Sequence, residues 1–243
     1  MENTMEKKEF QAESKRLLDL MINSIYTHRE IFLREILSNA SDALDKLAYR
    51  ALTDDKVGLN RDDLAIHITL DDKMKTITVS DNGIGMSHDE MEKNLGTIAR
   101  SGSYQFKQEA EQKEDASTII GQFGVGFYSA FMVAEAVTVI SKQYGSDEAW
   151  MWQSSGADGY TMTPCERDGF GTDVIMKLKA DTDDEKYSEY LQEYTIRNLV
   201  KKYSDYLRYP IRMEVTKYRQ VEDPDDKEKT KSEAYREIGR AHV

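Results

Sequence analysis

Cysteine is nearly absent from this sequence. The single residue, Cys165, excludes a disulfide bond within the chain and is compatible with a reducing cytosol. No apolar run approaches the roughly 18 residues that a membrane-spanning helix needs. The first residues, MENTMEKKEFQ, are charged and lack the apolar centre of a secretory signal. We therefore expect a cytoplasmic protein without a membrane span.

The chain also lacks an excess of positive charge. Its 33 lysine and arginine residues stand against 45 acidic residues, which gives a net charge of −12 over 243 residues. This balance argues against nonspecific binding to nucleic acid or to an anionic membrane. A polyanionic ligand would need a metal ion and a local group of hydrogen-bond donors. The length suffices to bury a core, as one large domain or two small ones.

The order of the periodic segments predicts an α+β fold. Predicted strands are 7–11, 65–70, 75–80, 136–142, 148–154, 159–164, 172–179 and 211–217, and predicted helices begin at Ser14, span 29–50 and recur across 187–207. Long runs of strands without intervening helices favour a layer of helices on one face of a mostly antiparallel sheet. No internal repeat is visible.

The last stretch of the chain has a different composition. Residues 221–238 are rich in both acids and bases and have almost no apolar side chains, which predicts a charged, solvated linker. Residues 239–243, GRAHV, continue no pattern, and we interpret them as a cloning remnant. The folded domain is therefore expected to span residues 1–220.

Residues 31–47, IFLREILSNASDALDKL, separate by side-chain type when placed on a helix. One face carries Leu33, Ile36, Leu37, Ala40, Leu44 and Leu47. The opposite face carries Glu35, Asn39, Asp42 and Lys46. This polar stripe fits a solvated surface. It also fits the wall of a pocket, in which a carboxylate one turn from an amide acts on a metal-bound substrate.

Two glycine motifs are candidates for ligand contact. DNGIGM, 81–86, follows a predicted strand, where Asp81 beside bare backbone suits an exocyclic amine such as that of adenine. An ordinary turn explains it equally. GQFGVGF, 121–127, precedes an apolar helix predicted to start near Phe127. Its backbone N–H groups can bind an anion, or its glycines can form a hinge. It matches neither a Walker A nor a Rossmann motif.

The segment between the motifs is polar, with glycine at both ends. This composition fits a lid, over about 96–126, and it also fits a disordered loop. A further candidate is Thr172 in FGTDVIM, which enters a strand after two glycines. Its hydroxyl can contact a ligand, although threonine is common in strands.

The helix at 31–47, the two glycine motifs, the segment between them and FGTDVIM, in this order and spacing, resemble the ATP-binding domain of the 90-kDa heat-shock chaperone family. Four stretches are similar to its signature blocks, namely FLREILSNASDALDK, DNGIGM, NLGTIARSG and GQFGVGFYSAF. The wider superfamily of gyrase B, MutL and sensor histidine kinases has a looser pattern. The resemblance extends over roughly residues 7–218, and Asn82 favours the bacterial branch. It implies a two-layer α/β sandwich of the GHKL (Bergerat) type, with the nucleotide between helices and a curved sheet.

The resemblance also implies residue roles. Glu35 would orient and deprotonate the attacking water. Asn39 would coordinate Mg²⁺ and bridge it to the phosphates. Asp81 would accept from the adenine amine, directly and through a water shared with Thr172. The other implied contacts are Met86 at adenine, Asn94 at the ribose, Gly124, Val125 and Gly126 at the phosphates, Phe127 at the helix start, Arg100 near the phosphates, and Asp42 and Lys46 as supports. At Arg100 other members carry lysine, which has a different geometry.

The same family implies parts that 243 residues do not accommodate. A middle domain supplies an arginine to the γ-phosphate, and a C-terminal domain dimerises the chain. Because a missing arginine finger slows other NTPases by about 10³–10⁵, we expect this chain to bind ATP and ADP with Mg²⁺ but to hydrolyse ATP very slowly. We expect the fragment to be a monomer and the full-length protein to be a homodimer. The expected partners are unfolded or partly folded client proteins.

Two other functions remain open at this point. A histidine kinase needs a phosphoacceptor on a dimerisation helix, and none of His28, His67, His88 and His242 lies in such a helix. A non-catalytic nucleotide sensor is the second alternative. Glu35 argues against it, since binding alone needs no base beside a metal ligand.

Overall fold

A nine-stranded sheet forms the frame of the part of the chain that this computed structural model describes, which is residues 6–8, 29–52, 54, 58, 60–96, 126–156, 158–203, 207–223 and 226–241. The strands are β1 (Glu6–Lys8), β2 (Ile66–Asp71), β3 (Thr76–Asp81), β4 (Ala134–Lys142), β5 (Ala149–Ser154), β6 (Tyr160–Cys165), β7 (Gly171–Leu178), β8 (Ile211–Asp223) and β9 (Asp226–Arg240). The helices are α2 (Ile31–Arg50), α3 (His88–Leu95) and α6 (Glu193–Tyr203), with 3₁₀ turns η2 (Arg61–Asp63), η3 (Gly126–Met132) and η4 (Tyr187–Leu191).

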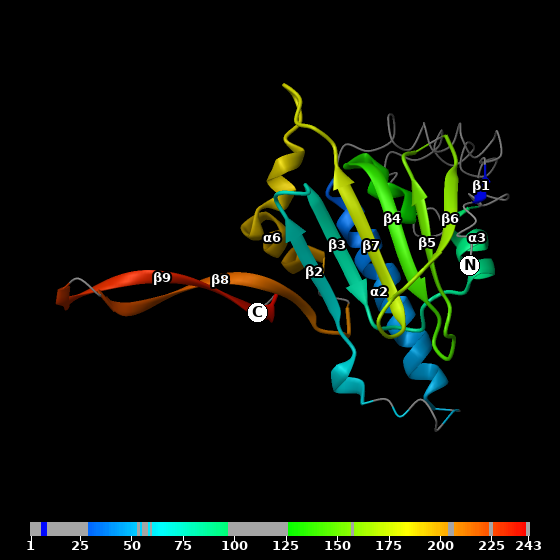
Figure 1. Cartoon of the computed structure of the whole chain (residues 1–243), viewed down its shortest axis with the longest axis horizontal. Helices are drawn as coiled ribbons and strands as arrows, with labels where there is room; N and C mark the ends of the chain where they lie inside the picture. The colour runs from blue at the N-terminus through cyan, green and yellow to red at the C-terminus, as the bar shows by residue number, and fades with distance from the viewer. Residues whose placement is uncertain are drawn as a thin grey trace.

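The strands are ordered β1-β6-β5-β4-β7-β3-β2-β8-β9, and among them β2 and β8 make the one parallel pair. Helices α2, α3 and α6 lie on the far side of the sheet in Figure 1. The predicted α+β sandwich with helices on one face is therefore confirmed. None of the helices in these residues is long and apolar enough to cross a membrane.

One row of side chains crosses the sheet on the face that the helices cover. It consists of Ile68, Val79, Val174, Val139, Trp152 and Met162, which are cross-strand neighbours in register. The next row, with Thr78 and Thr138, points to the other face and is half-buried. This alternation is expected where one face of an antiparallel sheet covers the core.

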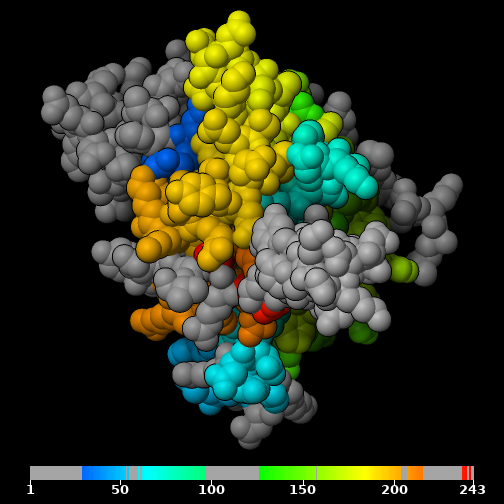
Figure 2. All heavy atoms as spheres, turned by 90° about the vertical axis from the view of Figure 1, so that its left-hand side faces the viewer, coloured from blue at the N-terminus to red at the C-terminus, as the bar shows by residue number. Residues whose placement is uncertain are grey.

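Helix α2 is buried along the apolar face that the sequence predicts. Leu33, Leu37, Leu44 and Leu47 are fully buried, and no glycine or proline interrupts the helix. Burying a leucine side chain contributes about 2 kcal/mol. Helix α6 packs beside the start of α2, where the Tyr203 hydroxyl donates to Glu30 Oε1 at 2.9 Å. In Figure 2 this pair of helices is seen as yellow to orange atoms next to blue ones.

Some predicted elements differ in type or extent. The apolar segment expected as a helix from Phe127 is the 3₁₀ turn η3, whose seven residues are all buried before the chain enters β4. Helical spacing places Tyr194 on one face with Tyr187 and Leu191, but those two lie in η4 and are buried, whereas Tyr194 in α6 is 76% exposed. The strand predicted at 7–11 is β1, and the helix predicted from Ser14 lies outside the described residues.

The largest difference concerns the predicted linker at 221–238. The structure pairs β8 with β9 in an antiparallel hairpin, which extends from the body of the molecule in Figure 1. Ladder hydrogen bonds join backbone groups and need no apolar side chains, so a composition rule misses them. Gly239 and Arg240 belong to β9, and the Ala241 N–H donates to the Ile211 carbonyl at 2.8 Å. The interpretation of 239–243 as a cloning remnant stays a prediction.

The loop after β3 packs closely on α2 at Gly83. A Cβ there would lie 2.5 Å from the Ala43 carbonyl carbon and 2.8 Å from the Leu44 nitrogen, and neither backbone atom can move aside cheaply. We expect Gly83→Ala to lower the free energy of unfolding by about 2–3 kcal/mol in urea.

The matched control is Gly145→Ala. This glycine has a φ of 81°, but a Cβ would meet open space. Its substitution should cost about 1 kcal/mol, from backbone strain alone. Equal losses in the two variants would contradict the close packing at Gly83.

Candidate active site

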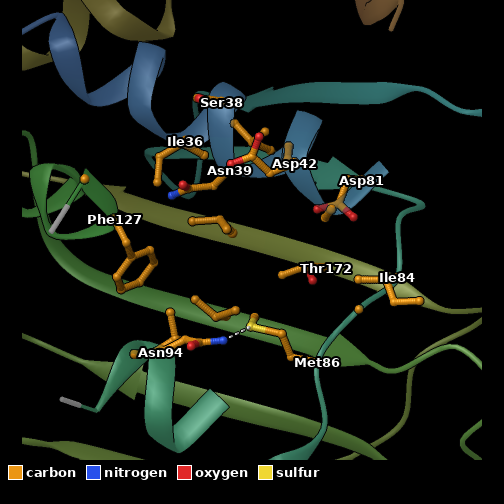
Figure 3. Close-up of a pocket in the computed structure, with 18 of the residues that line it drawn as sticks. Ile36, Ser38, Asn39, Asp42, Asp81, Ile84, Met86, Asn94, Phe127 and Thr172 are labelled. Carbon is orange, nitrogen blue, oxygen red and sulfur yellow. Dashed lines mark hydrogen bonds between the residues drawn. The ribbon is translucent and has the colours of Figure 1, made fainter. Parts of the chain in front are cut away.

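A cavity of about 770 Å³ lies between α2 and the sheet. Every predicted site residue that the structure describes lines it, namely Glu35, Asn39, Asp42, Asp81, Met86, Asn94, Gly126, Phe127 and Thr172. Figure 3 shows Asn39 and Asp42 on α2 on one side and Thr172, Met86 and Phe127 on the other. Arg100, Gly124, Val125 and most of the predicted lid lie outside the described residues. The polar stripe of α2 thus lines a cavity.

Glu35 and Asn39 occupy one end of this cavity. Glu35 is buried, and its Oε1 accepts from Arg34 through Nε at 3.0 Å and Nη2 at 2.8 Å. Its Oε2 lies against Gly126, where a Cβ would collide with the carboxylate. Glycine at this position therefore lets the backbone of the second glycine motif approach the carboxylate, with the Asn39 amide one turn away.

Asp81 lies at the other end, 6% exposed, at the end of β3. Its Oδ1 accepts from the Gly83 N–H at 2.9 Å. Burial raises the pKa of the Asp81 carboxyl to about 7, against the backbone N–H groups of Gly83 and Thr172 and the nearby Arg167, which lower it, while Asp173 raises it further. This carboxyl therefore changes charge near neutral pH.

The loop around Asp81 is held by backbone contacts that require glycine. Gly85 has a φ of 66°, and a Cβ there would run into the Lys142 carbonyl oxygen. On the other side of the loop, Asn82 accepts from the Ala65 N–H at 3.0 Å and donates to the Asp63 carbonyl at 2.8 Å. The position of Asp81 is thereby tied to β2 and β4.

Ser141 is a site residue that the sequence analysis does not identify. It is fully buried on β4, and its Oγ accepts from the Met86 N–H at 2.8 Å and lies 2.9 Å from Thr172 Oγ1. It also donates to the Gly171 carbonyl at 3.1 Å. In the sequence, Ser141 differs from its strand neighbours only as a serine among the apolar inward positions of β4. This pattern alone does not distinguish it from other serines in strands.

Helix α3 forms the rim beside Met86. Ser87 and Glu90 make a capping box, which begins the helix directly after the DNGIGM loop. Asn94 Nδ2 lies 3.9 Å from the sulfur of Met86, the contact dashed in Figure 3. Glu90 and Lys93 also line the cavity, and the sequence analysis does not single them out.

The donors around the cavity set a limit on metal binding. Among the described residues, no group of three or more His, Cys, Asp or Glu side chains could hold a metal ion. The Asn39 and Asp42 oxygens are nevertheless of the kind that Mg²⁺ prefers. Because Mg²⁺ is commonly held by one or two protein oxygens together with phosphate and water, these residues fit an ion that arrives with a phosphorylated ligand.

The sequence that forms this cavity, with an acid and an amide on one helix and a buried carboxylate on the sheet, matches known protein families. The family model for histidine kinase-, DNA gyrase B-, and HSP90-like ATPases matches residues 26–161, and the chain belongs to this family. A second model, Hsp90 protein, matches residues 189–241. Within the family the chain matches the N-terminal domain of bacterial Hsp90.

Three similar proteins are chaperones named HtpG. The chain is 58% identical over 219 residues to the chaperone protein HtpG of Clostridium botulinum strain Langeland, covering 90% of this chain and 35% of the relative. It is 60% identical over 212 residues to that of Bacillus subtilis strain 168, covering 87% and 34%. It is 59% identical over 218 residues to the chaperone protein HtpG of Clostridium acetobutylicum, covering 90% of this chain and 35% of the relative. The chain spans about a third of the length of these relatives.

The burial of Asp81 makes stability depend on pH in a defined direction. The folded state holds this proton up to about pH 7, whereas the unfolded chain loses it near the ordinary value of 3.8. Stability contributed by Asp81 is therefore greatest below pH 4 and is lost as pH rises toward 7, by on the order of 4 kcal/mol. We expect Asp81→Asn to remove this loss.

The measurement is urea unfolding of the parent chain and Asp81→Asn at pH 4.5 and pH 7.5. The difference between the two proteins cancels the other titrating groups. If the difference in unfolding free energy is the same at both pH values, Asp81 titrates normally and the argument from burial is wrong.

Proposed function

We propose that this cavity binds ATP and ADP with Mg²⁺ and that the chain is the ATP-hydrolysing module of a molecular chaperone. The observation that carries the proposal is the placement of two chemically different ends in one cavity. Asp81, with Thr172 beside it, offers hydrogen-bond acceptors to an amine. Glu35 and Asn39 offer a base and a metal ligand about one helical turn apart.

The adenine end is built from acceptors and apolar contact. The Asp81 carboxylate accepts from the exocyclic amine, directly and through a water shared with Thr172. Met86 lines the flat base, and Asn94 contacts the ribose at the rim formed by α3. Because the base enters a largely buried region, its recognition needs few polar groups, each with a defined orientation.

The phosphate end is where the reaction takes place. Glu35 orients a water molecule and takes its proton as the oxygen attacks the γ-phosphorus, and the bond from that phosphorus to the bridging oxygen breaks to release ADP. Asn39 holds Mg²⁺, which neutralises phosphate charge when bound, and Asp42 and Lys46 support this group. Gly126, with Gly124 and Val125 before it, places backbone N–H groups on the phosphates, and Phe127 follows at the start of η3. Arg100 approaches the same phosphates.

The remaining parts of the proposal concern the longer protein. The relatives named HtpG are chaperones, and we propose that ATP turnover drives closure of a lid, over about 96–126, and clamping on unfolded or partly folded client proteins in the cytoplasm. The full-length protein is a homodimer, whereas this chain is a monomer of one ATP-binding domain, whose sheet continues past the predicted boundary at residue 220 into β8 and β9. We further propose that these 243 residues by themselves turn ATP over very slowly, because the resemblance assigns an arginine at the γ-phosphate to a following domain.

Glu35→Ala tests the assignment of the base. In the corresponding full-length chaperone, we expect unchanged ATP affinity and a loss of turnover of at least about 100-fold, since a positioned base contributes about 10²–10⁴ in rate. Steady-state phosphate release and nucleotide titration measure the two quantities. Glu148→Ala, at an exposed position, is the control. Normal turnover by Glu35→Ala would show that the mechanism is wrong.

Asp81→Asn tests the recognition of adenine. The Gly83 N–H requires an oxygen at its 2.9 Å contact, so the amide nitrogen would turn toward the ligand and oppose the adenine amine. Calorimetric titration with Mg–ADP should detect binding to the parent chain and to Asp72→Asn, an exposed control, but not to Asp81→Asn. Absence of ADP binding to the parent chain would reject the whole nucleotide proposal.

A further inference from the structure

Arg167 is a nearly buried charge that the proposed mechanism does not use. It lies in the connection between β6 and β7, with 11% of its side chain exposed. Its Nε donates to Asp173 Oδ2 at 2.9 Å, and its Nη2 donates to Asp173 Oδ1 at 3.1 Å. This two-pronged geometry fixes the guanidinium plane relative to β7.

The same guanidinium also contacts the backbone of the adenine-binding residue. Nη2 donates to the Asp81 carbonyl oxygen at 3.3 Å, and Nη1 donates to the Gly169 carbonyl at 3.1 Å. Asp81 and Thr172 are register partners across β3 and β7. Asp173 follows Thr172 directly, so its side chain points to the opposite face of the sheet. The Arg167–Asp173 pair therefore lies behind the carboxylate that faces the cavity.

We propose that Arg167 and Asp173 are a positioning pair: from the far face of the sheet each charge shifts the protonation of the adenine-recognising carboxyl in the opposite direction, and their balance fixes the pH range of nucleotide binding. This inference rests on the proposed role of Asp81. An ionised Asp81 offers acceptors on both oxygens, whereas a protonated one presents a donor to the amine. Nucleotide affinity therefore rises as Asp81 loses its proton.

The two charges of the pair act on Asp81 in opposite directions. Arg167 lowers the pKa of the Asp81 carboxyl and Asp173 raises it, so that the intact pair leaves burial as the main influence. The other charged groups that line the cavity are Glu35, Asp42 and Lys46 on α2 and Glu90 and Lys93 on α3.

On the far face, Ser80 separates Asp173 from His67 in the cross-strand row, and burial followed by the charge of Arg212 lowers the pKa of His67. His67 is therefore neutral over the neutral pH range. Asp173 and Arg167 are then the charges in the immediate shell of Asp81 whose removal leaves the cavity lining itself intact.

The test measures Mg–ADP affinity by calorimetry at intervals from about pH 5.5 to 8.5 for the parent chain, Arg167→Gln, Asp173→Asn and the double variant. Arg167→Gln leaves Asp173 uncompensated and should move the midpoint of the affinity curve up by about half a pH unit or more. Asp173→Asn leaves Arg167 uncompensated and should move it down by a similar amount. The double variant should return toward the parent. Because a terminal phosphate also titrates near pH 6, only differences between variants are interpreted.

Two control variants make the same changes in net charge elsewhere. Arg197→Gln and Glu193→Gln break an ion pair on α6 with a 3.7 Å separation, and neither residue lines the cavity. Both should leave the midpoint unchanged. A pair with only a structural role would weaken binding in Arg167→Gln and Asp173→Asn without moving their midpoints apart. That result, or a shift of both midpoints in one direction, overturns the inference.

A second readout separates this inference from the proposed function. Carbon-13 NMR titration of the Asp81 carboxyl in the nucleotide-free chain should show the same opposite shifts. Opposite shifts without ADP binding would reject the proposed function and retain the electrostatic coupling. If circular dichroism shows that Arg167→Gln does not fold, Asp173→Asn must still lower the Asp81 midpoint, and an unchanged midpoint overturns the inference.

Discussion

The contact between α2 and the loop after β3 is the constraint on which the site depends. The Ile84 N–H donates to the Ala43 carbonyl at 3.0 Å, and Gly83 leaves no space for a side chain between the two backbones. A helix normally packs on a sheet through side chains at both surfaces. Here the two backbones meet at Ala43, inside the second half of the helix, and α2 lines the cavity from Glu35 to Lys46 around this point. The distance between α2 and the loop that carries Asp81 is therefore fixed at this backbone contact.

This constraint places two kinds of chemistry in one cavity. Asp81 is carried into a buried position by the end of β3, where desolvation raises its pKa to about 7. Glu35 is carried by α2 to the opposite end, where Gly126 brings the backbone of the glycine motif against it. Recognition of a base and activation of water need different electrostatic environments. The cavity provides both because Asp81 and Glu35 lie at its opposite ends. The Arg167–Asp173 pair extends the first environment to the far face of the sheet.

Much of the fold was predictable because its signals are local. The apolar stripe of α2 and the alternation in β3 follow from the periods of helix and strand, and both are confirmed. The β8–β9 hairpin was not predictable beyond the strand at 211–217, because its pairing there joins backbone groups in a segment without an apolar pattern. Ser141 was missed for a related reason: its partners, Met86 and Thr172, are distant in sequence, and only their meeting gives the serine a role.

The amino-acid sequence by itself determined which groups are available and which face of each element they occupy. Glu35 and Asn39 share a helix face because four residues make about one turn, and this holds before any tertiary contact forms. Only the tertiary structure decided that Asp81 meets Thr172 and that Arg167 lies behind both. Strand register and burial arise from contacts between distant segments, and the ionisation of a carboxyl depends on the water that those contacts exclude.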